Sequence, residues 1–166
     1  MLSADGGQQF FRAWFDDAQA RADLERQLPG ALFLGPRYGA ELARIYASLD
    51  IFAHTGPYET FGQTVQEAMA SGLPVLAPAA GGPLDLVAPG VTGVLLPPAD
   101  GTALAAAVAA LAADGPRRRA YGTAARAAVA TRSWSAVGDE LIGHYRAVAG
   151  ERRADPGPPR TYRLAA

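Results

Sequence analysis

The chain has 166 residues, 49% hydrophobic and 19% charged, with a formal net charge of −1 at pH 7, and a domain of this size buries enough surface to fold without a disulfide or a metal. It contains no Cys, which excludes thiol chemistry and cysteine-ligated zinc, and because His54 and His144 stand in no metal-binding pattern we expect no metal ion. Its longest apolar run, 103–113, is far below the roughly 20 residues that cross a bilayer, and residues 1–15 lack the basic start and apolar core of a signal peptide, so we expect a cytoplasmic protein.

The N-terminal segment, residues 1–17, fits no clear element and is treated as atypical. Its aromatic residues predict one face of a helix, either packed on a sheet or exposed for a partner. These residues are Phe10, Phe11, Trp14 and Phe15.

Strands and helices alternate in the middle of the chain. Short apolar runs bounded by Gly and Pro predict strands buried on both faces of a parallel sheet, at 31–35, 50–54, 74–77 and 93–96. Helical patterns stand before and between them, at 16–28, 40–48, 61–71, 83–87 and 102–113. This alternation predicts the α/β class, with a doubly wound parallel sheet built from right-handed βαβ units.

The C-terminal third is basic. Two further helices are predicted at 117–131 and 133–149, and the Pro- and Arg-rich stretch 150–166 predicts a disordered tail. All 15 basic residues are Arg; residues 1–114 carry a net charge of −7 and residues 115–166 a net charge of +6. Arg on solvent-exposed helix faces explains this asymmetry. Contact with the cytoplasmic face of an anionic membrane stays open as an alternative explanation. Nucleic acid is not among the partners that we expect.

The loop and helix after His54 carry the most informative residues. The carboxyl ends of strands in a doubly wound sheet are where ligands bind, and this loop follows such an end. Backbone N–H groups of Phe61, Gly62 and Gln63 are expected to point out of the helix N-terminus, where Gly62 lets a phosphate approach the backbone closely. His54 itself is expected to be a structural loop residue.

Two carboxylates flank this helix start. Glu67 follows Gln63 and Thr64 by about one turn, and because helical side chains lean toward the N-terminus its carboxylate could accept two hydrogen bonds from a ribose diol. Glu59 lies on the preceding loop, where it could bond sugar hydroxyls. A structural alternative stays open, since Thr60 and Gln63 match a capping box that needs no ligand and Glu67 also fits a solvated helix position. The sheet-facing side of the helix is predicted from Val65, Ala68, Met69 and Gly72.

These motifs, taken together, resemble a known family. Glu59, seven further residues, Glu67, the run EAMASGLPV and the Gly81–Gly82 loop closely resemble the C-terminal donor-binding domain of retaining glycosyltransferases of the GT-B fold, family four, also called glycosyl transferases group 1. The segments LARIYASLDIFAHTG, GGPLDLV and GVTGVLLPPAD follow in the family's order. The segment HTGPYETFGQTVQEAMASGLPVLAP is most similar to actinobacterial GDP-mannose-dependent α-mannosyltransferases. The resemblance predicts a nucleotide-sugar donor-binding domain over 18–149.

The resemblance implies roles for the residues at the helix start. Glu67 is expected to bind the ribose of the donor. Glu59 is expected to bind the hydroxyls of the donor sugar and is the expected catalytic residue. The backbone N–H groups of Phe61, Gly62 and Gln63 are expected to hold the diphosphate and sugar.

The resemblance also implies roles for two neighbouring loops. Gly35 and Arg37 are expected to receive the nucleobase. Gly81 and Gly82 are expected to shape the wall of the cleft. Asp85 stands where many members of the family have Glu, so its role is not assigned.

The resemblance further implies what a complete enzyme needs. Such an enzyme has a second Rossmann-like half for the acceptor, and its donor domain uses an Arg and a Lys to neutralise the departing pyrophosphate, whereas this sequence contains no Lys. Loss of that charge can slow transfer by ~10^2-fold or more. We therefore expect a truncated or split form, inactive alone, of an enzyme that transfers a hexosyl, in particular a mannosyl, group.

The expected ligand is GDP-mannose or another nucleoside diphosphate sugar, with no cofactor and no metal. One alternative is a non-catalytic binding module that pairs with an acceptor-domain polypeptide. A nucleotide-sugar epimerase is a further alternative that shares the fold. The exposed edge of an incomplete sheet also predicts self-association.

Overall fold

The computed structural model describes residues 9–11, 18–56 and 59–154. Contacts between residues divide the chain into two compact units, Met1–Ala130 and Thr131–Ala166. The first unit holds all the strands described below, and the described part of the second unit holds one helix.

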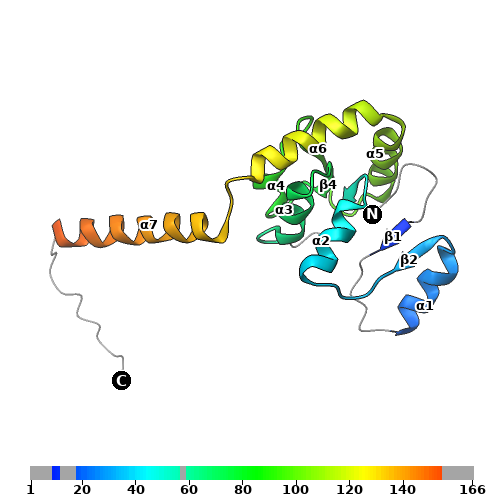
Figure 1. The fold of residues 1–166 in the computed structure, drawn as a ribbon, viewed down its shortest axis with the longest axis horizontal. Coiled ribbons are helices and arrows are strands. Elements are labelled where there is room, and N and C mark those ends of the chain that lie inside the picture. The colour runs from blue at the N-terminus through cyan, green and yellow to red at the C-terminus, as the bar shows by residue number, and fades with distance from the viewer. Residues whose placement is uncertain (1–8, 12–17, 57–58, 155–166) are drawn as a thin grey trace, which may run out of the picture. The chain divides into compact units, whose positions relative to one another are not determined.

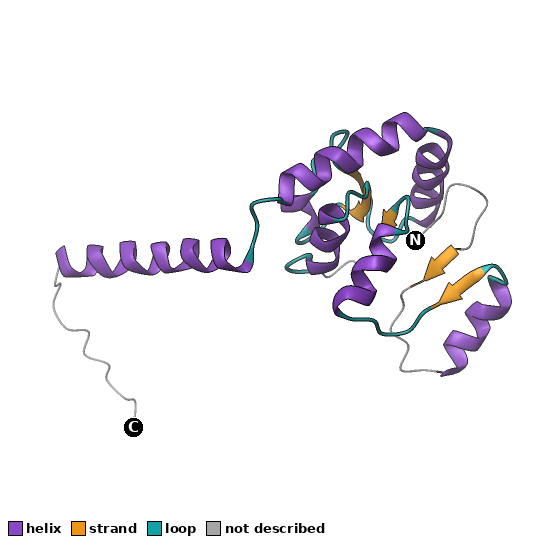
Figure 2. Ribbon diagram, in the orientation of Figure 1, coloured by secondary structure: helices purple, strands orange, loops and turns teal. Residues whose placement is uncertain are grey.

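The described part of the chain alternates short strands with helices, as Figures 1 and 2 show. The strands are β1 (Gln9–Phe11), β2 (Ala31–Phe33), β3 (Phe52–Ala53), β4 (Val75–Pro78) and β5 (Gly93–Leu96). The helices are α1 (Ala18–Gln27), α2 (Gly39–Ala47), α3 (Gln63–Ala70), α4 (Pro83–Leu86), α5 (Gly101–Ala113), α6 (Gly115–Val129) and α7 (Trp134–Ala154). Apart from the aromatic helix predicted near the N-terminus, every strand and helix predicted from the sequence is present, with ends that differ by a few residues, so the α/β class is confirmed.

All strand pairings are parallel. β1 pairs with β2 in a two-stranded sheet, with Gln9 opposite Ala31. β3, β4 and β5 form a three-stranded sheet in that order, with Val75 of the central strand opposite Gly93 of β5. Because β3 and β4 run in the same direction, their carboxyl ends and the loops that follow lie at one edge of the sheet.

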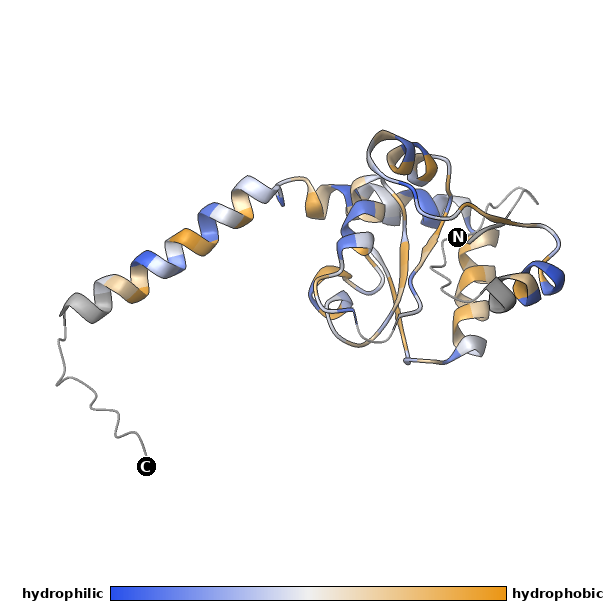
Figure 3. Ribbon diagram, turned by 90° about the horizontal axis from the view of Figure 1, so that it is seen from below, coloured by the Kyte–Doolittle hydropathy of each residue, from blue (hydrophilic) through white to orange (hydrophobic). Residues whose placement is uncertain are grey.

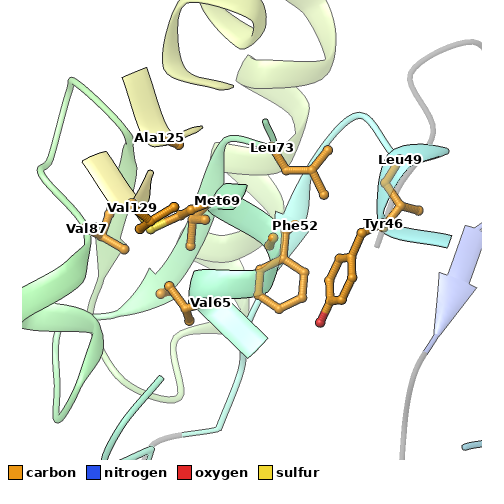
Figure 4. Packing of buried hydrophobic residues seen from close by; sticks show 12 residues of the cluster. Tyr46, Leu49, Phe52, Val65, Met69, Leu73, Val87, Ala125 and Val129 are labelled. Carbon is orange, nitrogen blue, oxygen red and sulfur yellow. The ribbon is translucent and has the colours of Figure 1, made fainter. Parts of the chain in front are cut away.

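The central strand β4 is buried on both faces, as predicted. Val75 and Ala77 pack with residues of α2, α3 and α6 (Figure 4), whereas Leu76 between them packs with residues of α5 and α6. This alternation follows from side chains that point to opposite faces of a strand. The sheet-facing side of α3 is also confirmed, since it holds three fully buried residues, Val65, Ala68 and Met69.

α6 approaches the end of α3 very closely. Gly72, which follows α3, has a φ of 78°, and a Cβ added to Gly122 in the middle of α6 would overlap its carbonyl oxygen. Only a residue without a side chain permits this contact between two backbones. The contact anchors the helix that carries Glu67 against the largest helix of the first unit.

The prediction of an aromatic helix near the N-terminus is wrong for Phe10 and Phe11. Both lie in strand β1, opposite Leu32 and Phe33 of β2. Aromatic residues favour strands when a partner strand is available, and here the partner lies about twenty residues further along the chain. Trp14 and Phe15 lie outside the described residues.

α7 forms the described part of the second unit. It continues to Ala154, into the stretch predicted as a disordered tail, because the first proline of that stretch is Pro156. Hydrophobic and hydrophilic segments alternate along it (Figure 3). Its large apolar side chains are exposed: Trp134, Leu141, Ile142, Tyr145 and Val148.

Candidate functional site

The loops that follow β3 and β4 meet at the edge of the sheet. The backbone N–H of Gly82 donates a hydrogen bond of 2.8 Å to the carbonyl oxygen of Glu59. A Cβ on Gly81 would overlap the same oxygen, and a Cβ on Gly82 would lie 2.7 Å from the carbonyl oxygen of Thr60. The two glycines therefore bring the second loop against the first through backbone alone.

The Glu59 carboxylate bonds the backbone at the start of α3. Its Oε1 atom accepts hydrogen bonds from the N–H of Phe61, at 3.2 Å, and from the N–H of Gly62, at 2.8 Å. Gly62 has a φ of 73°, in the left-handed region, so the chain turns into α3 directly after these two N–H groups. Two of the three N–H groups that the sequence predicted as free for a ligand are thus held by the carboxylate that was predicted to bond sugar hydroxyls.

The start of α3 differs from the predicted capping box. The helix begins at Gln63, its N-cap is Gly62, and no side chain caps it. A box with Thr60 as the N-cap is therefore not formed. Thr64, in the first turn, has a buried hydroxyl for which the described residues provide no hydrogen-bond partner. The N–H groups of the first turn have no acceptor within the helix, so this end of α3 suits an anion.

Glu67 is half-buried and held by both of its carboxylate oxygens. Gln63, one turn earlier on α3, donates from Nε2 to Oε1 at 3.3 Å, so the carboxylate leans toward the helix start as predicted. The hydroxyl of Tyr46 on α2 donates to Oε2 at 3.2 Å. The sequence analysis missed Tyr46, although Leu42, Tyr46 and Leu49 recur at helical spacing and mark an inward-facing aromatic side chain with a polar tip.

Gly35 and Arg37 lie in the loop between β2 and α2. Gly35 has a left-handed φ of 66°. The Arg37 guanidinium pairs with Glu41 through Nε, at 2.9 Å, and donates from Nη1 to the carbonyl oxygen of Pro36, also at 2.9 Å. Its hydrogen bonds in the structure are therefore local to the loop and the first turn of α2. Asp85 is exposed in the first turn of α4.

His54 directly follows strand β3. Its Nε2 atom is buried, with no hydrogen-bond partner among the described residues, and its ring lies 3.2 Å from where a Cβ of Gly56 would be. His54 also lines a cavity of about 180 Å³, together with Asp100 and Leu104 near the start of α5. As far as the described residues go, neither Glu59 nor Glu67 lines that cavity.

The arrangement around α3 offers a ligand hydrogen bonds and charge. Two carboxylates can accept hydrogen bonds from hydroxyl groups, and the first helical turn favours a negatively charged group. In the part of the chain that the structure describes, no three His, Asp or Glu side chains are placed to hold a metal ion. The same part contains no helix that is long and apolar enough to span a membrane.

Comparison with known proteins finds a matching family and relatives that are all glycosyltransferases by name. The family described as glycosyl transferases group 1 matches residues 13–128. The GDP-mannose-dependent alpha-mannosyltransferase of Mycolicibacterium smegmatis is 58% identical over 138 residues, which are 82% of this chain and 36% of that protein. The protein of the same name from Mycobacterium tuberculosis is 54% identical over 137 residues, 82% of this chain and 35% of the relative. The chain thus spans about a third of the length of these relatives.

Solved structures share the fold. Anabaena HepE, solved in complex with UDP, superposes with a TM-score of 0.74 at 26% identity, covering 85% of this chain and 41% of the other. Sucrose-phosphate synthase from Thermosynechococcus elongatus superposes with a TM-score of 0.73 at 32% identity, covering 88% of this chain and 38% of the other. In both cases the likeness extends over most of this chain and less than half of the solved one.

Proposed function

Because this chain belongs to the glycosyl transferases group 1 family, we propose that it acts as the donor nucleotide-sugar-binding domain of a retaining glycosyltransferase, over residues 18–149. Its α/β fold is that of the C-terminal domain of GT-B glycosyltransferases. One observation carries the proposal. The half-buried Glu67 carboxylate is held one helical turn from the open N-terminus of α3, so an acceptor for a diol and donors for a diphosphate lie on one helix.

The residues around α3 then divide the donor between them. Glu67 accepts hydrogen bonds from the ribose hydroxyls. The first turn of α3, from Gln63 onward, faces the diphosphate. Glu59 leaves the N–H groups of Phe61 and Gly62 to the phosphate and turns to the hydroxyls of the sugar. The Glu59 carboxylate then loses its two N–H donors and gains hydroxyl donors from the sugar, while the N–H groups gain the phosphate as acceptor.

The proposed donor is GDP-mannose or another nucleoside diphosphate sugar. The printed names of the two mycobacterial relatives support the mannosyl donor, and the UDP bound to HepE supports a nucleotide in this type of domain. Gly35 and Arg37 are proposed to receive the nucleobase. A guanidinium can donate two hydrogen bonds to O6 and N7 of guanine, and for that Arg37 has to leave its contact with Glu41. Gly81 and Gly82 are proposed to form the wall of the donor cleft, without a metal ion.

Transfer itself is proposed to need a further polypeptide segment. The sequence contains no Lys to neutralise the departing pyrophosphate, and the matched part of the chain covers only about a third of the length of these relatives. We therefore propose hexosyl transfer with retention only when an acceptor domain is present, as part of the same or of a separate polypeptide. A non-catalytic binding module that pairs with an acceptor-domain polypeptide is the second candidate. A cytoplasmic location, self-association through a sheet edge and contact with a membrane surface stay part of the proposal.

The first test is calorimetric titration of the chain with GDP, UDP and GDP-mannose. We expect saturable binding that Glu67→Ala weakens by more than about tenfold, or ~1.4 kcal/mol, because the ribose loses its acceptor. Glu140→Ala removes the same charge from exposed α7 and is expected to leave binding unchanged. Absence of binding at millimolar nucleotide, in a chain shown to be folded by circular dichroism, would overturn the donor-binding proposal.

A further inference from the structure

Tyr46 reaches the candidate site from inside the core. It is 2% exposed, and its ring packs against Phe52 of β3 with 5.8 Å between ring centroids and an interplanar angle of 57°. Figure 4 shows the ring between Phe52 and Leu49, with the hydroxyl at its far end. Close packing of this kind leaves a buried side chain a single rotamer. The position of the hydroxyl is therefore set by the core.

Two acceptors on α3 lie within reach of the Tyr46 hydroxyl. Oε2 of Glu67 lies at 3.2 Å and the carbonyl oxygen of Thr64 at 3.5 Å. A phenol has one proton to donate, and the ionised carboxylate is the closer and the stronger acceptor. The Glu67 carboxylate thus receives one bond from a fixed core residue and one from Gln63, whose side chain is exposed.

The two hydrogen bonds leave the Glu67 carboxylate able to accept two more. Each carboxylate oxygen has about two lone pairs, and Tyr46 and Gln63 occupy one on each oxygen. One acceptor position on each oxygen remains, which is what two neighbouring hydroxyl groups of a ribose require. A carboxylate without these bonds rotates about its last torsion, and binding then has to stop that rotation.

We propose that Tyr46 is a positioning residue, whose hydroxyl fixes the orientation of the Glu67 carboxylate for the ribose diol. The inference rests on the proposed donor-binding function. It assigns the orientation of the Glu67 carboxylate on α3 to Tyr46 on α2. Tyr46 does not touch the ligand. The effect of Tyr46 on nucleotide affinity therefore depends on Glu67 and on the ribose diol. A residue that only supports the fold would not show this dependence.

The test uses Tyr46→Phe, which keeps the packed ring and removes the hydroxyl. Wild type and variant are titrated with GDP and with 2′,3′-dideoxy-GDP, which lacks the diol. We expect the variant to bind GDP up to about tenfold more weakly, because binding then has to immobilise a carboxylate that rotates more freely, and to bind the dideoxy nucleotide as wild type does. Tyr121→Phe is the matched control, because Tyr121 is also buried and its hydroxyl accepts a hydrogen bond from Arg117, at 2.9 Å.

A second measurement needs no ligand. The free energies of unfolding of Tyr46→Phe, Glu67→Gln and the double variant form a thermodynamic cycle, and we expect the two substitutions to be non-additive. Additive effects, or an equal loss of affinity for both nucleotides, would show that the hydroxyl supports only the fold and would overturn the inference.

The outcomes also separate this inference from the proposed function. If Glu67→Ala weakens GDP binding and Tyr46→Phe does not, donor binding stands and the positioning role fails. If the folded wild-type chain binds no nucleotide, both fail. If Tyr46→Phe weakens only the binding of GDP and the cycle is non-additive, both are supported.

Discussion

At the start of α3, one oxygen of the Glu59 carboxylate accepts hydrogen bonds from two backbone N–H groups, of Phe61 and Gly62. A carboxylate and a phosphate are both anions, so Glu59 takes the place that a diphosphate suits. The diphosphate of the proposed donor therefore has to displace the Glu59 carboxylate before it accepts hydrogen bonds from these N–H groups. The same side chain then both opposes the phosphate and assists the sugar.

Glu59→Gln tests this competition at the scale of one residue. An amide binds backbone N–H groups more weakly than a carboxylate, by on the order of 1 kcal/mol, so we expect the variant to bind GDP several-fold more tightly. The advantage of GDP-mannose over GDP is expected to shrink, because a neutral amide accepts weaker hydrogen bonds from sugar hydroxyls. Titration of both ligands measures the two effects, with Glu25→Gln on exposed α1 as the control. Tighter binding in the control, or weaker GDP binding in the variant, would contradict the competition.

Contacts between distant residues explain which parts of the site escaped the sequence analysis. Glu67 was found because its neighbour Gln63 is one turn away on the same helix, where spacing alone predicts proximity. The bond from Tyr46 depends on how α2 packs against α3, and no local pattern reports that packing. The bonds of Glu59 depend on the path of the loop before α3, and no local pattern in the sequence reports that path.

At the scale of elements, the close approach of α6 to the end of α3 fixes the helix that carries Glu67. The approach depends on Gly122, whose missing side chain leaves room for the carbonyl oxygen of Gly72. Sequence signals placed both helices to within a few residues, and for α3 the apolar spacing and the following Gly72 mark the helix and its end. Strand β1 was missed, because three residues are too few for a periodic pattern and its partner is distant in sequence.

Gly122→Ala is expected to destabilise the chain by about 1–3 kcal/mol, since the added Cβ separates two packed backbones. Gly143→Ala is the matched helical control. No atom lies within 4 Å of its Cβ position, and alanine favours a helix over glycine by up to about 1 kcal/mol, so this change is expected to cost nothing. Urea unfolding measures both free energies. Equal stability of Gly122→Ala and wild type would show that α3 and α6 adjust without loss.

At the scale of the whole molecule, every buried hydrophobic residue among those that the structure describes precedes the second unit. Val129 is the last of them in sequence, and α7 exposes its large apolar side chains. The fold class and the layered core were predictable, because four apolar runs alternate with helical patterns. The division after Ala130 was not, because α7 has the same composition as a packed helix, with Leu141 and Tyr145 one turn apart.

Removal of residues 131–166 is therefore expected to leave the core of the first unit intact. We expect the free energy of unfolding of a chain ending at Ala130 to lie within about 0.5 kcal/mol of that of the full chain, as for changes away from packed features. Urea unfolding followed by circular dichroism measures it. A loss of several kcal/mol would show that α7 contributes to the core, and Gly122→Ala in the same shortened chain provides a positive control for a true packing defect.

The backbone contacts of Gly81 and Gly82 restrict which mutations this corner of the fold tolerates. Any substitution at either position adds a Cβ that meets the carbonyl oxygen of Glu59 or Thr60. Both glycines lie in a loop outside the strands and helices that enclose the core, so such a change first alters the geometry of the site. An evolving lineage could in this way lose its ligand by a single substitution and still inherit a folded domain, free to serve as a scaffold for another partner.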